Sequence, residues 1–163
     1  MKTLLIVYDS VTGGARQMAE AAQRGAAAEP QTTTRLLHAD EAGPEAVLAA
    51  DGYLFVTPEM LAALSGRMKY FFDRTYYGVL DRIEGRPYAH LICAGSDGEN
   101  AMRQVARIAA GWRLACVAEP IIVCTHAQTP SAILAQKTIG LADLKRCEET
   151  GAALAAGLAM GVF

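Results

Sequence analysis

Five short apolar runs, each separated from the next by a segment with helical features, constrain the fold of this chain most strongly. The runs cover residues 3–8, 33–38, 52–57, 89–94 and 121–125, and each has the length of a buried strand. Strands that alternate with helices are joined by right-handed crossovers into a parallel sheet with helices on both faces. We therefore expect an α/β, doubly wound fold of three layers, with five strands in the order 2-1-3-4-5.

The segments between the runs predict where the helices lie. Apolar residues at helical spacing follow the first run, and a second such segment begins after Ser65, a good N-cap residue. Its Phe71 and Phe72 are expected in the core. Ser96 and Glu99 have the spacing of a capping box, which predicts a helix from about residue 98. A short helix is expected at 44–49 and a long one at 141–160.

Composition limits the classes of protein to which the chain can belong. Its 163 residues are 52% hydrophobic, which is enough for one core, so we expect one domain over residues 1–163. A net charge of -2 gives no basic surface for nucleic acid, and no apolar segment predicts a membrane span. The four cysteines lack metal-ligand spacing and are interpreted as buried free thiols of a cytoplasmic protein.

Three loops are expected to meet at the carboxyl ends of strands one, three and four, where open parallel sheets bind ligands. They cover residues 9–15, 58–64 and 95–100. The first reads D-S-V-T-G-G-A and enters a helix directly, so that backbone amides, hydroxyls and a helix N-terminus could cradle a phosphate. A glycine-rich turn with Thr12 as helix cap is the alternative. The loop lacks both the triphosphatase and the dinucleotide-binding patterns.

Two segments resemble known flavoproteins. The loop S-V-T-G-G-A resembles the flavodoxin phosphate loop, and T-P-E-M-L-A-A-L-S-G-R-M-K-Y-F-F-D-R, at residues 57–74, is similar to a segment of NAD(P)H-dependent FMN reductases and WrbA-type quinone reductases. The resemblance implies a flavodoxin-like fold and the cofactor flavin mononucleotide (FMN). The cofactor-binding residues that it implies are Ser10, Val11, Thr12, Gly13, Gly14, Ala15, Thr57, Pro58, Glu59, Met60, Leu61, Gly95, Ser96 and Asp97. Arg16 would lie near the phosphate.

The chain departs from the family pattern in two places. Ala15 stands where the family often has a hydroxyl, and losing one hydrogen bond to an anion weakens binding by about 1.5–3 kcal/mol. The ring loops contain no tyrosine or tryptophan, so Met60 and Leu61 would pack on the flavin instead. Simple core or interface packing is the alternative for these two residues. A second subunit could supply an aromatic, such as Tyr77 or Trp112.

The resemblance implies an FMN-dependent oxidoreductase that takes hydride from NAD(P)H and reduces a quinone, a flavin or a similar small acceptor by two-electron transfer. A flavodoxin-type electron carrier is the alternative, although 15 basic and 17 acidic residues lack the acidity typical of carriers. A flavodoxin-like domain that has lost its cofactor is a further alternative. A receiver domain needs an aspartate where the chain has Thr57 and Pro58. The resemblance allows a homodimer or homotetramer, and His126 is the one histidine expected near the site.

Overall fold

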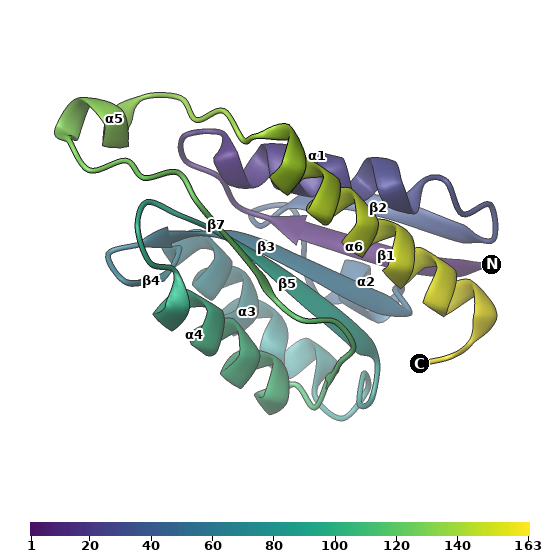
Figure 1. Ribbon diagram of the computed structural model, residues 1–163. Coiled ribbons are helices and arrows are strands. Elements are labelled where there is room, and N and C mark those ends of the chain that lie inside the picture. Colours follow the sequence, from purple (N-terminus) through teal and green to yellow (C-terminus); the bar gives the residue numbers. More distant parts are fainter.

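A twisted parallel sheet runs through the middle of the molecule, with helices on both faces (Figure 1). The computed structural model describes all 163 residues. The strands of the sheet are β1 (Lys2–Tyr8), β2 (Thr32–His38), β3 (Gly52–Met60), β5 (Pro87–Ala94), β6 (Ala115–Cys116) and β7 (Ile121–Cys124). Their order is β2-β1-β3-β5, and both β6 and β7 pair in parallel with β5. The predicted order is confirmed, and its fifth strand is divided into two short pieces.

The helices form two layers. Helices α1 (Gly14–Ala26) and α6 (Leu141–Met160) cover one face, while α2 (Pro44–Leu48), α3 (Gly66–Val79) and α4 (Glu99–Gly111) cover the other (Figure 1). The first pair packs closely because a Cβ on Gly25 or Gly151 would come within 1.9 Å of a backbone oxygen on the opposite helix. This contact sets the position of α1, whose N-terminus forms part of the candidate site. None of the helices is both long and apolar enough to cross a membrane.

Each face of the sheet has its own hydrophobic core. The core under α2, α3 and α4 is aromatic, with Phe55 lying 5.0 Å from Phe72 and 6.3 Å from Trp112 between ring centroids. The core positions expected for Phe71 and Phe72 are confirmed. Trp112 is only 6% exposed, so the expectation that it could cover the flavin of a neighbouring subunit is wrong.

The edge of the sheet beyond β5 accommodates a proline. Pro120 lies just before β7, where its missing N–H interrupts no ladder of backbone hydrogen bonds.

The prediction of four buried cysteines is only partly confirmed. All four cysteines are free thiols, and Cys93 and Cys147 are buried as expected, but Cys116 is exposed and Cys124 is half-buried. The prediction fails for Cys116 because β6 is a two-residue edge strand whose side chains no helix covers.

Local structure differs from the predictions in three further places. Strand β3 runs on to Met60 and turns back into β4 (Ala63–Leu64), so residues 58–64 form a hairpin rather than a loop. The capping box is absent, because Gly98 caps α4 with φ 85° and Asp97 accepts the bond from the Glu99 amide. A short helix that was not predicted, α5 (Pro130–Leu134), lies apart from the sheet (Figure 1).

Candidate functional site

A cavity of about 460 Å³ opens at the carboxyl ends of β1, β3 and β5, where the three predicted loops meet. Its size lies within the range of roughly 300–1,000 Å³ that is usual for small-molecule sites. Every residue of the predicted site lines it except Gly13, Thr57 and Asp97. Two other hollows lie at the opposite ends of the strands, beside the exposed ion pair of Lys2 and Asp51, where parallel sheets do not bind ligands.

One end of the cavity is built from the phosphate loop (residues 9–16) and the N-terminus of α1. Gly13 precedes the helix with φ 88° and its amide donates to Ser10 Oγ at 3.2 Å. A Cβ on Gly14 would come within 2.6 Å of Cys93 Sγ on β5, so a glycine there lets the helix end approach the sheet. Free amides and the positive end of the helix dipole favour an anion.

Neither Arg16 nor Ala15 offers a side-chain donor to this end of the cavity. Arg16 donates to Glu20 at 2.7 Å and does not line the cavity. Ala15 lines the cavity but is buried in the core under α1. The donors that this loop offers to an anion are therefore backbone amides and the hydroxyls of Ser10 and Thr12.

The ring hairpin (residues 58–64) forms a second wall. Its turn residues Leu61 and Ala62 both have positive φ, at 50° and 63°, and the Leu61 side chain is 99% exposed. Two bonds tie the hairpin to α4: Glu59 Oε2 accepts from Gly98 N at 2.5 Å, and Asn100 Nδ2 donates to Ala62 O at 2.6 Å. The hairpin thus holds an apolar surface at the mouth of the cavity.

Three predicted residues, Gly13, Thr57 and Asp97, do not line the cavity. Thr57 is buried, and its hydroxyl lies 3.2 Å from Ser65 Oγ, which caps α3 through the Met68 amide. Asp97 is exposed at the start of α4. Gly13 contributes backbone to the phosphate loop.

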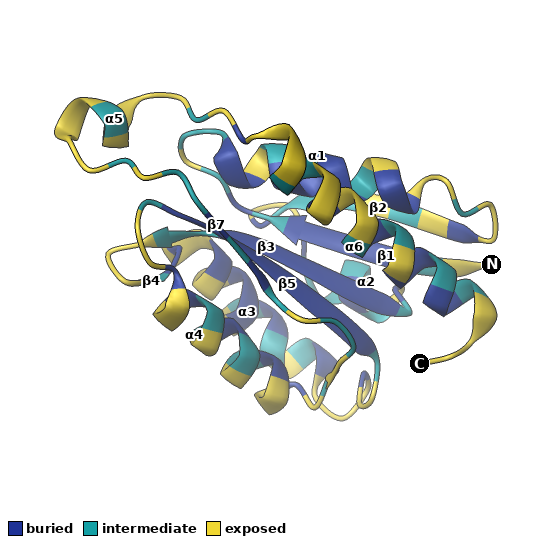
Figure 2. Ribbon diagram, viewed as in Figure 1, coloured by how far each residue is buried: buried dark blue, intermediate teal, exposed yellow.

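A strap (residues 125–140) between β7 and α6 forms the third wall, and the sequence analysis placed only His126 of this segment near the site. The cavity residues that it contributes are Thr125, Ala127, Ile133, Leu134 and Lys137. Most of the strap is exposed (Figure 2), and Leu134 is 78% exposed although it lines the cavity. The one available signal was Thr129 before Pro130, an N-cap followed by a favoured first helical residue.

Charged groups cluster at the end of β1, beside the phosphate loop. The Asp9 carboxylate is 1% exposed and lies 3.2 Å from His38 Nε2 and 3.5 Å from Arg67. These contacts join β1, β2 and α3 without entering the cavity. His126 is exposed on the strap and makes no hydrogen bond.

The cavity residues fit FMN in kind. Hydroxyls and backbone amides gather at the phosphate loop, while Met60 and Leu61 offer apolar surface on the hairpin and Ile133 and Leu134 offer it on the strap. No phenylalanine, tyrosine or tryptophan lines the cavity. Cys93 does line it, and burial raises the pKa of this thiol to about 11, which keeps it protonated at neutral pH and leaves it a poor nucleophile.

Sequence comparison assigns the chain to a family. The family model described as NADPH-dependent FMN reductase matches residues 39–129, a segment that contains the ring hairpin and the loop before α4. The chain belongs to this family. A protein named flavodoxin from Aquifex aeolicus (strain VF5) is 38% identical over 86 residues, which cover 53% of this chain and 46% of that protein. The alignment thus spans a little under half of the relative's length.

Solved structures agree with the flavodoxin-like fold of this FMN reductase family member. A flavodoxin from the domain Archaea superposes with a TM-score of 0.77 at 17% identity, covering 96% of this chain and 98% of that one. A WrbA-like flavodoxin from Agrobacterium tumefaciens superposes with a TM-score of 0.68 at 20% identity, covering 99% of both chains. The predicted flavodoxin-like fold and family are therefore confirmed.

Proposed function

We propose that this protein binds FMN in the cavity and works as an NAD(P)H-dependent oxidoreductase that reduces a quinone, a flavin or a similar small acceptor. The observation that carries the proposal is the pairing of an anion cradle with an apolar, partly open ring site in one cavity. The family assignment supports the same cofactor. Bound FMN would supply reversible two-electron chemistry.

The phosphate end of the cavity would bind and orient the cofactor. The amides that follow Gly13 and the hydroxyls of Ser10 and Thr12 would hold the phosphate at the N-terminus of α1. Gly14 permits the close approach of this helix end to β5. These groups would orient the bound cofactor from its phosphate end.

The ring end admits a reactant. Met60, Leu61 and the Gly95–Ser96 backbone would border the isoalloxazine ring, and Glu59 would keep the hairpin beside α4 through its bond to Gly98. No aromatic side chain covers the ring site, so a nicotinamide and then a flat acceptor could stack there in turn. No acid–base pair lines this part of the cavity, in keeping with chemistry that the cofactor carries.

An electron carrier that serves a protein partner is the second candidate. The 38% identity to a protein named flavodoxin favours it. The near balance of 15 basic and 17 acidic residues disfavours it, because strongly acidic surfaces steer carriers to basic partners.

Two measurements test the proposal. The purified protein is titrated with FMN and its visible spectrum recorded, and the complex is then mixed anaerobically with NADH or NADPH in a stopped-flow instrument. We expect a yellow complex that either nucleotide bleaches rapidly. A yellow complex that neither nucleotide bleaches would identify a carrier, and a protein that binds no FMN would be a domain that has lost its cofactor.

A further inference from the structure

We infer that Lys137 binds the phosphate group of FMN and makes the cavity prefer FMN to riboflavin, which lacks the phosphate. The inference rests on the proposed function and adds a residue of the strap to the phosphate site.

Three hydrogen bonds hold this part of the strap against the phosphate loop and the first turn of α1. Lys137 N donates to Thr12 O at 2.8 Å, Gln17 Nε2 donates to Lys137 O at 2.7 Å, and Ile139 N donates to Gln17 Oε1 at 3.0 Å. The same Gln17 amide also donates to Gly13 O at 3.0 Å. Residue 137 is therefore positioned by backbone contacts that do not depend on its side chain.

Lys137 is the only cationic side chain that lines the cavity. The other charged lining residue is Glu59, which lies at the ring end and accepts a bond from Gly98. Arg16, the cation nearest in sequence to the phosphate loop, is engaged by Glu20 at 2.7 Å. A phosphate dianion in the cradle would thus find one cation within the cavity, and a Cβ on Gly14 would lie 3.4 Å from Lys137 Cβ.

The ammonium group can exchange its present partners for a phosphate. Lys137 Nζ donates to the carbonyl oxygens of Ile133, at 2.8 Å, and Ala135, at 2.5 Å. Both acceptors are neutral, and an ammonium group has three donors on a flexible stem. The two carbonyl oxygens occupy only two of these three donors, and a phosphate adds the attraction between opposite charges, which a neutral carbonyl oxygen lacks. The phosphate would therefore compete successfully for Nζ.

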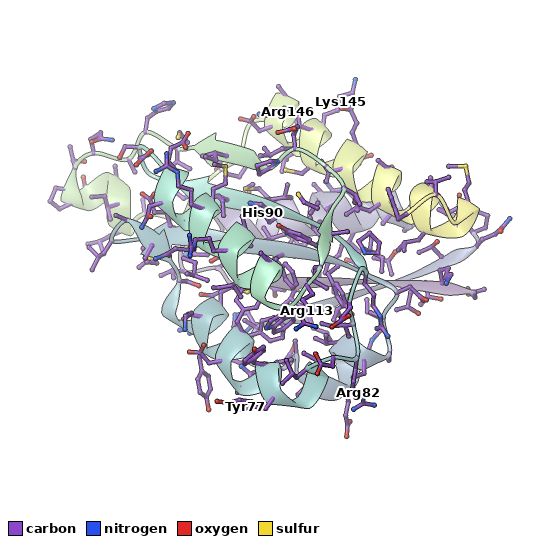
Figure 3. The ribbon with its side chains drawn as sticks, turned by 90° about the horizontal axis from the view of Figure 1, so that it is seen from below. Tyr77, Arg82, His90, Arg113, Lys145 and Arg146 are labelled. Atoms are coloured by element: carbon purple, nitrogen blue, oxygen red, sulfur yellow. The ribbon has the colours of Figure 1, made fainter.

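Dissociation constants for FMN and for riboflavin test the inference. They are measured by flavin fluorescence for the wild type, Lys137→Met, Lys137→Arg and Lys145→Met. Lys145 lies on α6 with its side chain at the surface (Figure 3) and does not line the cavity, so Lys145→Met is a control of matched charge. We expect Lys137→Met to weaken FMN binding by roughly 10- to 100-fold and to leave riboflavin binding unchanged. Lys137→Arg should keep most of the FMN affinity.

A second readout is the salt dependence of FMN binding, which should be weaker in Lys137→Met than in the wild type because one cation is lost. An equal loss of FMN and riboflavin affinity, or no loss of either, would overturn the inference while leaving the proposed function in place. A wild-type protein that binds no FMN would remove both.

Discussion

The carboxylate of Glu59 accepts a hydrogen bond of 2.5 Å from the backbone amide of Gly98, and this bond joins the ring hairpin to the N-terminus of α4. Two walls of the cavity that are 39 residues apart in the sequence thereby keep a fixed relation. The carboxylate also lies at the positive end of the α4 dipole, which favours it further.

Glu59→Ala should lower the free energy of unfolding by about 1.5–3 kcal/mol, the usual contribution of a hydrogen bond to a charged group, and should weaken FMN binding. Urea denaturation and FMN titration measure the two effects. Glu99→Ala is the matched control, because Glu99 is exposed in the first turn of the same helix. Equal stability of the two variants would show that the Glu59–Gly98 bond contributes nothing.

Gly13→Ala should destabilise the protein by about 1–3 kcal/mol and weaken FMN binding, because a non-glycine residue would be strained at φ 88°. The new Cβ would also come within 2.8 Å of Gln136 Oε1. Gly66→Ala is the control: it lies in the first turn of α3 with open space around its Cβ position, so it should stabilise by about 0.4–1 kcal/mol. Thermal unfolding compares the two, and an unchanged FMN affinity in Gly13→Ala would place the phosphate elsewhere.

The double substitution Leu61→Asn and Ala62→Gly should raise the free energy of unfolding by about 1 kcal/mol. Both turn residues have positive φ in a two-residue hairpin, a conformation that Asn-Gly adopts with little strain. The fully exposed Leu61 side chain loses no core contact. Urea denaturation measures the gain, and Leu134→Asn, another exposed leucine of the cavity mouth, should give none.

His90 should make the protein less stable in acid. It lies inside the sheet (Figure 3) with no hydrogen-bond partner on either ring nitrogen, and burial lowers its pKa to about 4. Because the unfolded chain binds a proton near pH 6.5 and the folded protein does not, stability falls as the pH drops from about 6.5 to 4. The full effect is roughly 3 kcal/mol.

His90→Phe should flatten this pH dependence and raise stability at pH 5, as measured by urea denaturation between pH 7 and pH 4.5. His126→Asn, which removes an exposed imidazole, is the control and should keep the profile of the wild type. A His90→Phe variant with an unchanged profile would assign the acid sensitivity to other groups.

The parts of the structure that were predictable are those that a repeating pattern specifies. Apolar runs specify the strands, and the doubly wound order brings their carboxyl ends together, so the sequence located the cavity through two of its walls. The strap lacked such a pattern, because Ile139 is its only buried residue. The hairpin turn was hidden because Leu61 and Ala62 are not turn residues, and Gly98 took the capping position expected of Ser96.

The exposed strap also means that the entrance of the cavity can change separately from the rest of the fold. Its helix α5 buries no residue, so substitutions or insertions there cost the sheet and the two cores little free energy. Two proteins that share this scaffold could thus differ in the shape of the cavity entrance through changes in α5 alone. Transplanting α5 alone from a relative, with Lys137 kept in place, is a direct route to an altered cavity entrance.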